Sequence, residues 1–306
     1  MDLFTAMNRK YQYKLYGLTI DSVLECPELI PGNGEQPDVK INLGEVPRTI
    51  PNIRKKGAMF QASSDEFLFF RQNIAWYHIR HGNEIIVEPQ PNADPDEVKL
   101  CLLNSPFGAL LHQRGYLVLH GSTIQIVEGC IAFLGKSGAG KSTLAATFHK
   151  HGYSVVTDDV CAILSDKQNM HPIVQPEGRY GKIWADTLVA LGEDESEQKP
   201  LLSDMGKYYF EYRNVCSGPL PLKRIYVLTI GNEQRIFLNH LTQFEKISAL
   251  IRNTYRFKFA KGLNIEKEHF NNCVRIANKV PIVQITRPSQ PFLLEELFER
   301  ILNDAF

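Results

Sequence analysis

One eight-residue segment of the chain combines three glycines with two lysines and two serines. Residues Gly135–Ser142 read Gly-Lys-Ser-Gly-Ala-Gly-Lys-Ser and match the pattern G-x-x-x-x-G-K-S/T at every fixed position. In such a loop the glycines let backbone N–H groups surround phosphate oxygens, the lysine reaches the β- and γ-phosphates, and the serine hydroxyl ligates Mg²⁺. An apolar strand precedes the segment, and the helix that follows favours negative charge at its N-terminus. The predicted phosphate-binding residues are Gly135, Lys136, Ser137, Gly138, Ala139, Gly140, Lys141, Ser142 and Thr143.

Two adjacent carboxylates follow the next apolar stretch. Asp158 and Asp159 come after the sequence Ser-Val-Val-Thr, and Asp158 follows Lys141 by 17 residues. That interval holds one helix and one returning strand, which places the pair at the carboxyl edge of a strand, where ligand crevices form. One carboxylate can ligate Mg²⁺ while the other accepts a proton from an attacking hydroxyl. A solvated turn is the structural alternative, because Asp is common in turns.

A histidine precedes the loop. His120 ends the apolar stretch Tyr-Leu-Val-Leu, 21 residues before Lys141. Taken alone, a histidine at a strand end is more often structural than catalytic.

The elements that must position these residues change in character along the chain. Residues 11–90 form short apolar or alternating runs separated by turn clusters, which is typical of a β-rich region. The segment 89–97 is the best candidate for a linker, and 96–115 has helical spacing with Gly115 as a stop. We therefore predict two domains, a β-rich one at 1–95 and an α/β one at 96–306.

The second domain alternates strands and helices, which predicts an α/β layered fold. Strands are expected at 116–121, 122–127, 130–135, 154–159, 222–230 and 280–286. Helices are expected at 140–150, at 241–257 with Thr242 and Glu245 in capping-box spacing, at 265–279 and at 291–302.

The chain resembles the HPr serine kinase/phosphorylase superfamily. The shared features, in the family's order, are His120-Gly121, the loop at 135–142, the helix end His-Lys-His-Gly-Tyr (149–153) and Asp158-Asp159. The resemblance implies a P-loop kinase domain of the phosphoenolpyruvate-carboxykinase-like type, with ATP and Mg²⁺ as cofactors. It also implies a catalytic set of His120, Lys141, Asp158 and Asp159.

A departure from the family concerns the segment after the second strand. The family's Glu lies in a signature with Gly and Arg, and its counterpart here, Glu177-Gly178-Arg179, has a different order. The resemblance assigns Ser142, Asp159 and Glu177 as metal ligands and Arg179 as a candidate phosphate contact. Residues 178–186 and 111–122 are closer to a divergent branch that includes kinases for the C-terminal Ser of lasso-peptide precursors.

That branch suggests an acceptor. The leading hypothesis is a serine kinase acting on a peptide or protein, most specifically on the C-terminal Ser of a lasso-peptide precursor. The alternatives are a kinase for free serine or another small molecule, and a nucleotide-binding regulatory module without a phosphoryl acceptor.

Two further segments are candidates for substrate recognition. Residues 193–214 mix charges with Ser, Pro and Gly, consistent with a mobile loop that offers Lys207 and Arg213 as substrate or phosphate contacts. In the β-rich domain, exposed sheet edges can bind an extended peptide, with apolar contacts from 67–71 and 75–79. Core packing is the alternative for those aromatic residues.

The composition excludes several other classes. Lys+Arg and Asp+Glu both number 34, so the net charge is zero and no global field favours nucleic acid. No window approaches the 18 or so apolar residues of a membrane span, and no secretory signal begins the chain, so we expect a cytoplasmic protein with no membrane partner. The six cysteines form no CxxC pair and are expected to be reduced. A homo-oligomer stays open.

Overall fold

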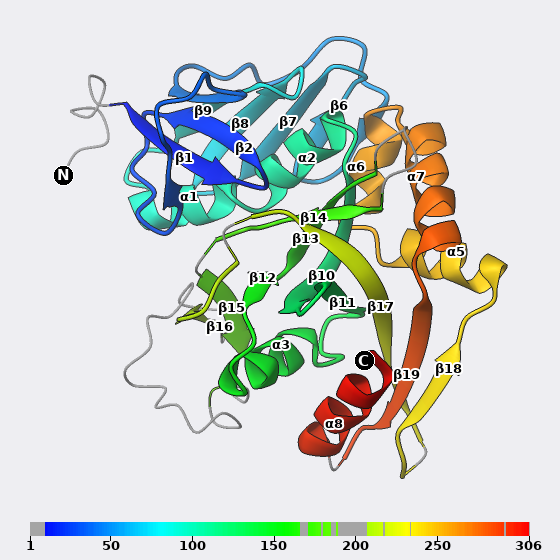
Figure 1. Cartoon of the computed structure of the whole chain (residues 1–306). Helices are drawn as coiled ribbons and strands as arrows, with labels where there is room; N and C mark the ends of the chain where they lie inside the picture. Colours follow the sequence, from blue (N-terminus) through cyan, green and yellow to red (C-terminus); the bar gives the residue numbers. More distant parts are fainter. Residues whose placement is uncertain are drawn as a thin grey trace. The chain divides into compact units, whose positions relative to one another are not determined.

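The computed structural model describes residues 10–165, 171–178, 180–184, 188, 207–216, 218–232, 234–290 and 292–305, with only the backbone at 180–184, 207 and 209. The chain forms two compact units, and neither is continuous in sequence. Unit 1 runs through Val118 and includes Tyr255–Asn271, while unit 2 holds Leu119–Thr254 and the residues from Asn272 onward. Both units combine a β-sheet with helices, so the mixed α/β class is confirmed (Figure 1).

The sheet of unit 1 has nine strands in the described part of the chain. Their spatial order is β3-β1-β2-β4-β9-β8-β7-β6-β5, with parallel pairing at β2–β4 and β4–β9 and antiparallel pairing elsewhere. The strands are β1 (Tyr11–Leu15), β2 (Leu18–Ser22), β3 (Ile30–Pro31), β4 (Val39–Leu43), β5 (Lys55–Lys56), β6 (Phe60–Ala62), β7 (Glu66–Arg71), β8 (Ala75–Arg80) and β9 (Glu84–Pro89).

Both faces of this sheet are covered around β7. On one face lie the helices α1 (Pro95–Leu102), α2 (Ser105–Gln113) and α6 (Phe257–Gly262), where Phe67 of β7 contacts Phe259 with ring centroids 4.4 Å apart. On the other, Leu68 packs with Val46 and Ile50 of the preceding loop. Two buried faces explain the unbroken apolar run in β7. Phe67, Phe69 and Tyr77 are buried, which supports core packing for these three side chains, whereas Phe70 and Trp76 are partly exposed. Peptide binding by this region stays a prediction.

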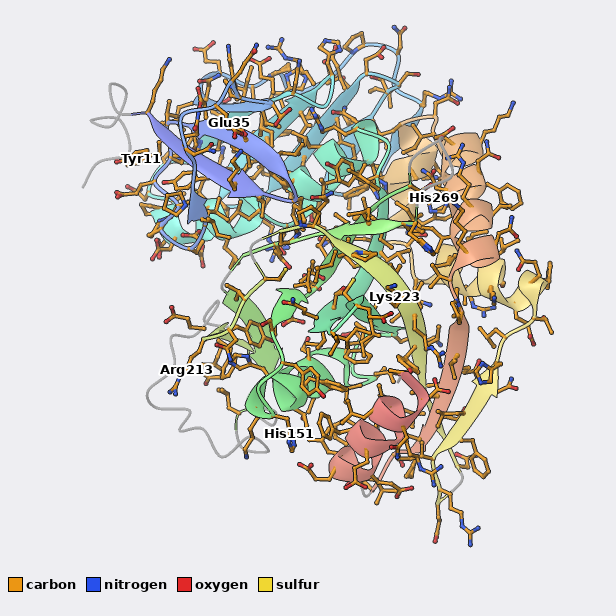
Figure 2. All side chains as sticks on the ribbon, viewed as in Figure 1. Tyr11, Glu35, His151, Arg213, Lys223 and His269 are labelled. Carbon is orange, nitrogen blue, oxygen red and sulfur yellow. The ribbon has the colours of Figure 1, made fainter. Side chains whose placement is uncertain are left out.

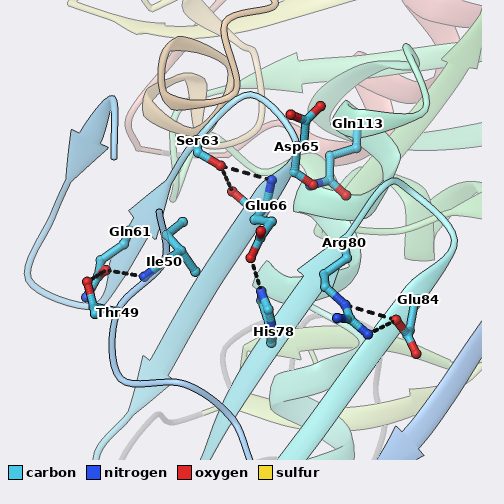
Figure 3. A network of polar contacts seen from close by, with 10 residues as sticks. All are labelled: Thr49, Ile50, Gln61, Ser63, Asp65, Glu66, His78, Arg80, Glu84 and Gln113. Atoms are coloured by element: carbon cyan, nitrogen blue, oxygen red, sulfur yellow. Dashed lines mark hydrogen bonds and ion pairs between the residues drawn. The ribbon is translucent and has the colours of Figure 1, made fainter. Parts of the chain in front are cut away.

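Polar contacts fix the loop that carries Val46 and Ile50 to the strands. The amide of Gln61 accepts hydrogen bonds from Ile50 N–H (3.2 Å) and the Thr49 hydroxyl (3.1 Å), which fixes the loop to β6 (Figure 3). On β7 and β8, His78 Nε2 lies 2.6 Å from Glu66 Oε2. These groups satisfy polar atoms that the packing would otherwise leave buried without partners.

The segment 89–97 joins the sheet to α1 rather than separating two units. The Tyr77 hydroxyl donates to Val98 O (2.9 Å), and the Asp94 side chain accepts from Asp96 N–H as the N-cap of α1. The structural units therefore divide at 118/119, whereas the sequence places the boundary at 95/96. The predicted single helix over 96–115 is wrong, because the chain breaks at Asn104. The next helix, α2, begins at Ser105 and has Pro106 in its first turn, where the ring prevents continuation of the preceding helix.

Unit 2 contains the second sheet. In its described part the strand order is β11-β10-β13-β14-β17-β19-β18, β12 pairs with β10, and β11 also pairs with β17. The strands are β10 (Leu117–Ile126), β11 (Gly129–Gly135), β12 (Val155–Thr157), β13 (Val160–Leu164), β14 (Ile173–Gln175), β17 (Leu220–Gly231), β18 (Phe237–His240) and β19 (Ile282–Pro288). A separate hairpin pairs β15 (Tyr180–Trp184) with β16 (Lys207–Glu211).

Helices cover this sheet. They are α3 (Lys141–Lys150), α5 (Gln243–Arg252), α7 (Glu266–Lys279), which begins in unit 1, and α8 (Leu294–Ala305). Phe148 of α3 packs between Phe133 of β11 and Phe298 of α8, with centroid distances of 5.4 and 4.7 Å. This core holds α3 at the end of β11. The predicted capping box is confirmed, because Thr242 N–H donates to Glu245 Oε2 (2.8 Å). No helix in the described residues is long and apolar enough to cross a membrane.

Two buried histidines make unit 1 sensitive to pH. Burial lowers the pKa of His112 and the pKa of His269 to about 4. Because an unfolded histidine titrates near 6.5, the unfolded chain binds protons that the folded chain does not between about pH 6.5 and 4. The free energy of unfolding therefore falls as the pH falls through this window, by up to about 1.4 kcal/mol per pH unit for each histidine.

We expect the free energy of unfolding of His112→Gln to depend less steeply on pH, because one of the two histidines no longer contributes. Urea unfolding from pH 7 to 4.5 measures this slope. The matched control is His81→Gln at an exposed turn, where the exchange removes no buried imidazole. An unchanged slope in His112→Gln, whatever its absolute stability, would contradict the assignment.

Candidate active site

The segment predicted to bind phosphate connects β11 to α3. Gly138 and Gly140 have φ values of 81° and 102°, conformations that residues with side chains rarely adopt. Lys141 is 6% exposed, and its Nζ donates to the carbonyl oxygens of Gly135 (3.0 Å) and Lys136 (3.2 Å). The ammonium group is thus folded back over the loop. No acidic residue lies in the first turn of α3, so the positive end of the helix keeps its attraction for an anion.

The register of β10 places His120 beside this loop. Gly121 pairs with Leu134 of β11. His120, the residue before Gly121, therefore lies level with Gly135, where the loop begins. On its other side β10 pairs with β12, with Thr123 opposite Thr157. Since both neighbours run antiparallel to β10, β11 and β12 end at the same sheet edge, roughly 10 Å apart across two strand spacings. The loop, the histidine and the two aspartates therefore share one edge.

His120 and Asp159 contact each other. Nδ1 of His120 lies 3.1 Å from Asp159 Oδ1 and 3.1 Å from the Asp159 carbonyl oxygen. A carbonyl can only accept, so a hydrogen bond to it requires a proton on Nδ1. Both side chains are partly exposed, at 33% and 21%. Asp159 has a φ of 94°, a strained value for a residue other than glycine, of the kind that concentrates at functional sites.

Asp158 has a different environment, although it is the adjacent residue. Its side chain is buried, and its Oδ1 and Oδ2 accept hydrogen bonds from the Ser122 hydroxyl (2.7 Å) and the Tyr212 hydroxyl (3.1 Å). Burial, with Asp158 nearby, raises the pKa of Tyr212 well above its ordinary value, so Tyr212 stays a donor. The backbone N–H of Asp158 donates to Glu177 Oε2 (2.9 Å). Asp158 is anchored, whereas Asp159 faces the partly exposed histidine.

Of the remaining predicted residues, one lies beside Asp158, one lies away from the loop, and the side chains of the others are outside the described part of the chain. Glu177 lies just after β14 and beside Asp158, as its contact shows. Arg179 and residues 193–206 lie outside the described residues, as does the Lys207 side chain at the start of β16. Arg213 N–H donates to His149 Nε2 (3.2 Å) near the C-terminal end of α3, about 12 Å along the helix axis from Lys141 (Figure 2). The structure does not bring the Arg213 backbone to the loop.

The residues predicted to hold Mg²⁺ are hard oxygen donors. Ser142, partly exposed in the first turn of α3, supplies a hydroxyl, and Asp159 and Glu177 supply carboxylates. No group of three or more His, Cys, Asp or Glu side chains among the described residues forms an all-protein metal cage. Mg²⁺ is usually held by one or two carboxylates together with water and substrate phosphates, so this donor set fits it.

Sequence reasoning missed two donors to Asp158. Ser122 follows His120 by two residues on the same strand, so both side chains lie on one face, and this spacing was a usable signal. Tyr212 lies more than 50 residues beyond Asp158, and nothing in its local sequence indicates the contact.

Comparisons with known proteins give similarities among solved structures. No protein-family model matches the chain, and no curated protein matches it. A solved structure of the Hpr(Ser) kinase/phosphatase from Coxiella burnetii aligns with 61% of this chain and 95% of its own, at 12% identity and a TM-score of 0.31.

We expect Tyr212→Phe to lower the free energy of unfolding by about 1.5–3 kcal/mol, because it removes a buried hydrogen bond to a carboxylate. The matched control is Tyr153→Phe, whose hydroxyl makes no hydrogen bond among the described residues while its ring packs on Phe148 and Phe298. Urea unfolding measures both. Equal stability of the two variants would show that the Tyr212 hydroxyl does not anchor Asp158.

Proposed function

We propose that the chain is an ATP- and Mg²⁺-dependent kinase that transfers a phosphoryl group to a serine hydroxyl. The observation that carries the proposal is the His120–Asp159 pair at the sheet edge where β11 enters the loop. A glycine-rich loop at a helix N-terminus binds phosphate, and a partly exposed carboxylate at the same edge can accept a proton. Together they provide the two requirements of phosphoryl transfer to an alcohol, namely charge neutralisation and a base.

Asp159 is the better candidate for the base. Both oxygens of Asp158 already accept hydrogen bonds from hydroxyl groups, whereas Asp159 is partly exposed and its carboxylate is oriented by His120 Nδ1–H. In the transfer step the serine proton moves to the Asp159 carboxylate while the serine oxygen bonds to the γ-phosphorus and ADP leaves. Asp158 then acts as a positioning residue, since it fixes the strand end from which Asp159 projects.

The loop supplies the positive charge. Lys141 and the first N–H groups of α3 would bind the β- and γ-phosphates, with Thr143 in the first helical turn. With Asp159 accepting the proton, Ser142 and Glu177 are the residues left to hold the metal. When bound, Mg²⁺ offsets phosphate charge as the transition state forms.

For the acceptor we propose a serine of a peptide or protein, most specifically the C-terminal Ser of a lasso-peptide precursor. This part rests on the sequence resemblance at 111–122 and 178–186. Incubation with Mg²⁺ and ATP, and with a Ser-terminated peptide, free serine or no acceptor, distinguishes the alternatives by the mass gain of one phosphate. Phosphorylated free serine alone would identify a small-molecule kinase. Hydrolysis at one rate without any phosphorylated product would indicate a regulatory nucleotide-binding module and contradict the proposal.

We expect Asp159→Asn to lower kcat by at least about 100-fold, because a positioned general base contributes on the order of 10²–10⁴ to the rate. The KM for ATP should change by less than about threefold, since the loop stays intact. The matched control is Asp65→Asn, the same exchange at an exposed turn of unit 1. Wild-type kcat in Asp159→Asn would remove Asp159 as the base.

A further inference from the structure

A buried arginine contacts the phosphate-binding loop from the neighbouring strand. Arg287 lies near the end of β19 and is 5% exposed. Its Nε and Nη2 both donate to the carbonyl oxygen of Ala139, at 3.1 and 3.0 Å, and its Nη1 donates to Pro288 O (2.8 Å). Ala139 lies inside the loop, two residues before Lys141. One guanidinium group thus holds a single loop carbonyl with two hydrogen bonds.

Among the residues that the structure describes, this arginine has no anionic partner. No carboxylate in the described part of the chain forms an ion pair with Arg287, and its hydrogen-bond acceptors there are backbone carbonyls. Burial lowers the pKa of Arg287, yet a guanidinium stays charged at neutral pH. Buried charges are normally paired, because removing an ion from water is costly. An uncompensated cation beside a loop predicted to bind phosphates therefore suggests that the missing anion is the ligand.

A phenylalanine fixes the arginine against the same loop. The Arg287 guanidinium lies 4.0 Å from the ring centroid of Phe292, a cation–π distance. Phe292 also packs on Gly140, where a Cβ would lie 2.6 Å from the ring's Cζ. Gly140 is thus required for close approach as well as for its φ of 102°. Two successive loop residues, Ala139 and Gly140, are held by two side chains from one short stretch of the chain.

The peptide between these residues explains what the contact achieves. In a trans peptide the C=O and the following N–H point in opposite directions. When Arg287 binds the Ala139 carbonyl, the N–H of Gly140 must point away from Arg287. The arginine thereby fixes the direction of one N–H in the loop that the proposed function requires for phosphate binding.

We propose that Arg287 is a positioning residue for the nucleotide phosphates, which orients the Ala139–Gly140 peptide and adds a positive charge behind the loop that phosphates balance. The proposal rests on the proposed function, because it assumes that the loop binds phosphates. It predicts that the contribution of Arg287 to affinity grows with the number of phosphates on the ligand. A purely structural arginine would affect adenosine, AMP and ATP alike.

The test measures the affinity of Arg287→Met and Arg287→Lys for ATP, AMP and inorganic pyrophosphate by calorimetry, with thermal unfolding of each ligand-free variant. We expect Arg287→Met to lower the affinity for ATP and for pyrophosphate by at least about tenfold, and the affinity for AMP by less than about threefold. Arg287→Lys, which keeps the charge but not the two-pronged contact, should recover part of the loss. The KM for ATP should rise while kcat at saturating ATP stays within about threefold.

The matched control is Arg300→Met, the same exchange on an exposed part of α8 where the arginine pairs with Glu296. Equal losses for AMP and ATP, or unchanged ATP affinity in folded Arg287→Met, would overturn the proposal. If Arg287→Met does not fold, Arg287→Lys decides, since undiminished pyrophosphate affinity there would contradict the role of the two-pronged contact.

Failure of the proposed function has a separate signature. Wild-type protein that binds neither ATP nor pyrophosphate, or Lys141→Met that binds them undiminished, would remove the phosphate loop itself, and the role of Arg287 with it. If the wild-type protein binds ATP and pyrophosphate, Lys141→Met does not, and Arg287→Met binds them with undiminished affinity, only the role of Arg287 is removed.

Discussion

The register of β10 between β11 and β12 is the constraint on which the candidate site depends. Because side chains alternate along a strand, a slip of one residue would turn His120 to the opposite face and away from Asp159. The register is protected at Gly121, where a Cβ would lie 2.7 Å from the carbonyl oxygen of Phe133. A larger residue would push β10 from β11. The dipeptide His120-Gly121 therefore combines a reactive group with the residue that keeps it in register.

The same edge separates the two aspartates into different environments. Asp158 continues β12 and turns inward, where Ser122 and Tyr212 donate to it, and the chain then reverses at Asp159 with a positive φ. The strained backbone of Asp159 is held by neighbours on both sides, since its carbonyl accepts from Gly121 N–H and from His120. The buried, hydrogen-bonded Asp158 thus supports the partly exposed, strained Asp159. Placing a reactive carboxylate commonly needs such support.

The sequence predicted those parts of the structure that depend on local spacing. Gly135–Ser142, the capping box at Thr242 and the strand before Asp158 are local patterns, and the structure contains the corresponding loop, cap and strand end. The contacts that select between Asp158 and Asp159 come from distant segments. Tyr212 reaches Asp158 across more than 50 residues, and no periodicity encodes that distance.

The unit boundary could not be predicted for a related reason. Segment 89–97 has the Pro and Asp content of a linker, yet Asp94 caps α1 and Tyr77 of β8 binds the first turns of that helix. The return of Tyr255–Asn271 to unit 1 depends on packing between segments far apart in sequence, such as Phe67 with Phe259. Composition reports the flexibility of a segment in isolation, whereas the burial of its neighbours decides whether it separates domains.

The zero net charge of the chain conceals an uneven local distribution. Lys141 and Arg287 are both buried at the loop, one bonded to the carbonyls of Gly135 and Lys136 and the other to that of Ala139. Carbonyl dipoles stabilise a buried guanidinium only in part, so under the proposed function a bound polyphosphate would relieve an electrostatic cost at Arg287. The role proposed for Arg287 would link the stability of unit 2 to phosphate binding and would make β19 part of the phosphate site.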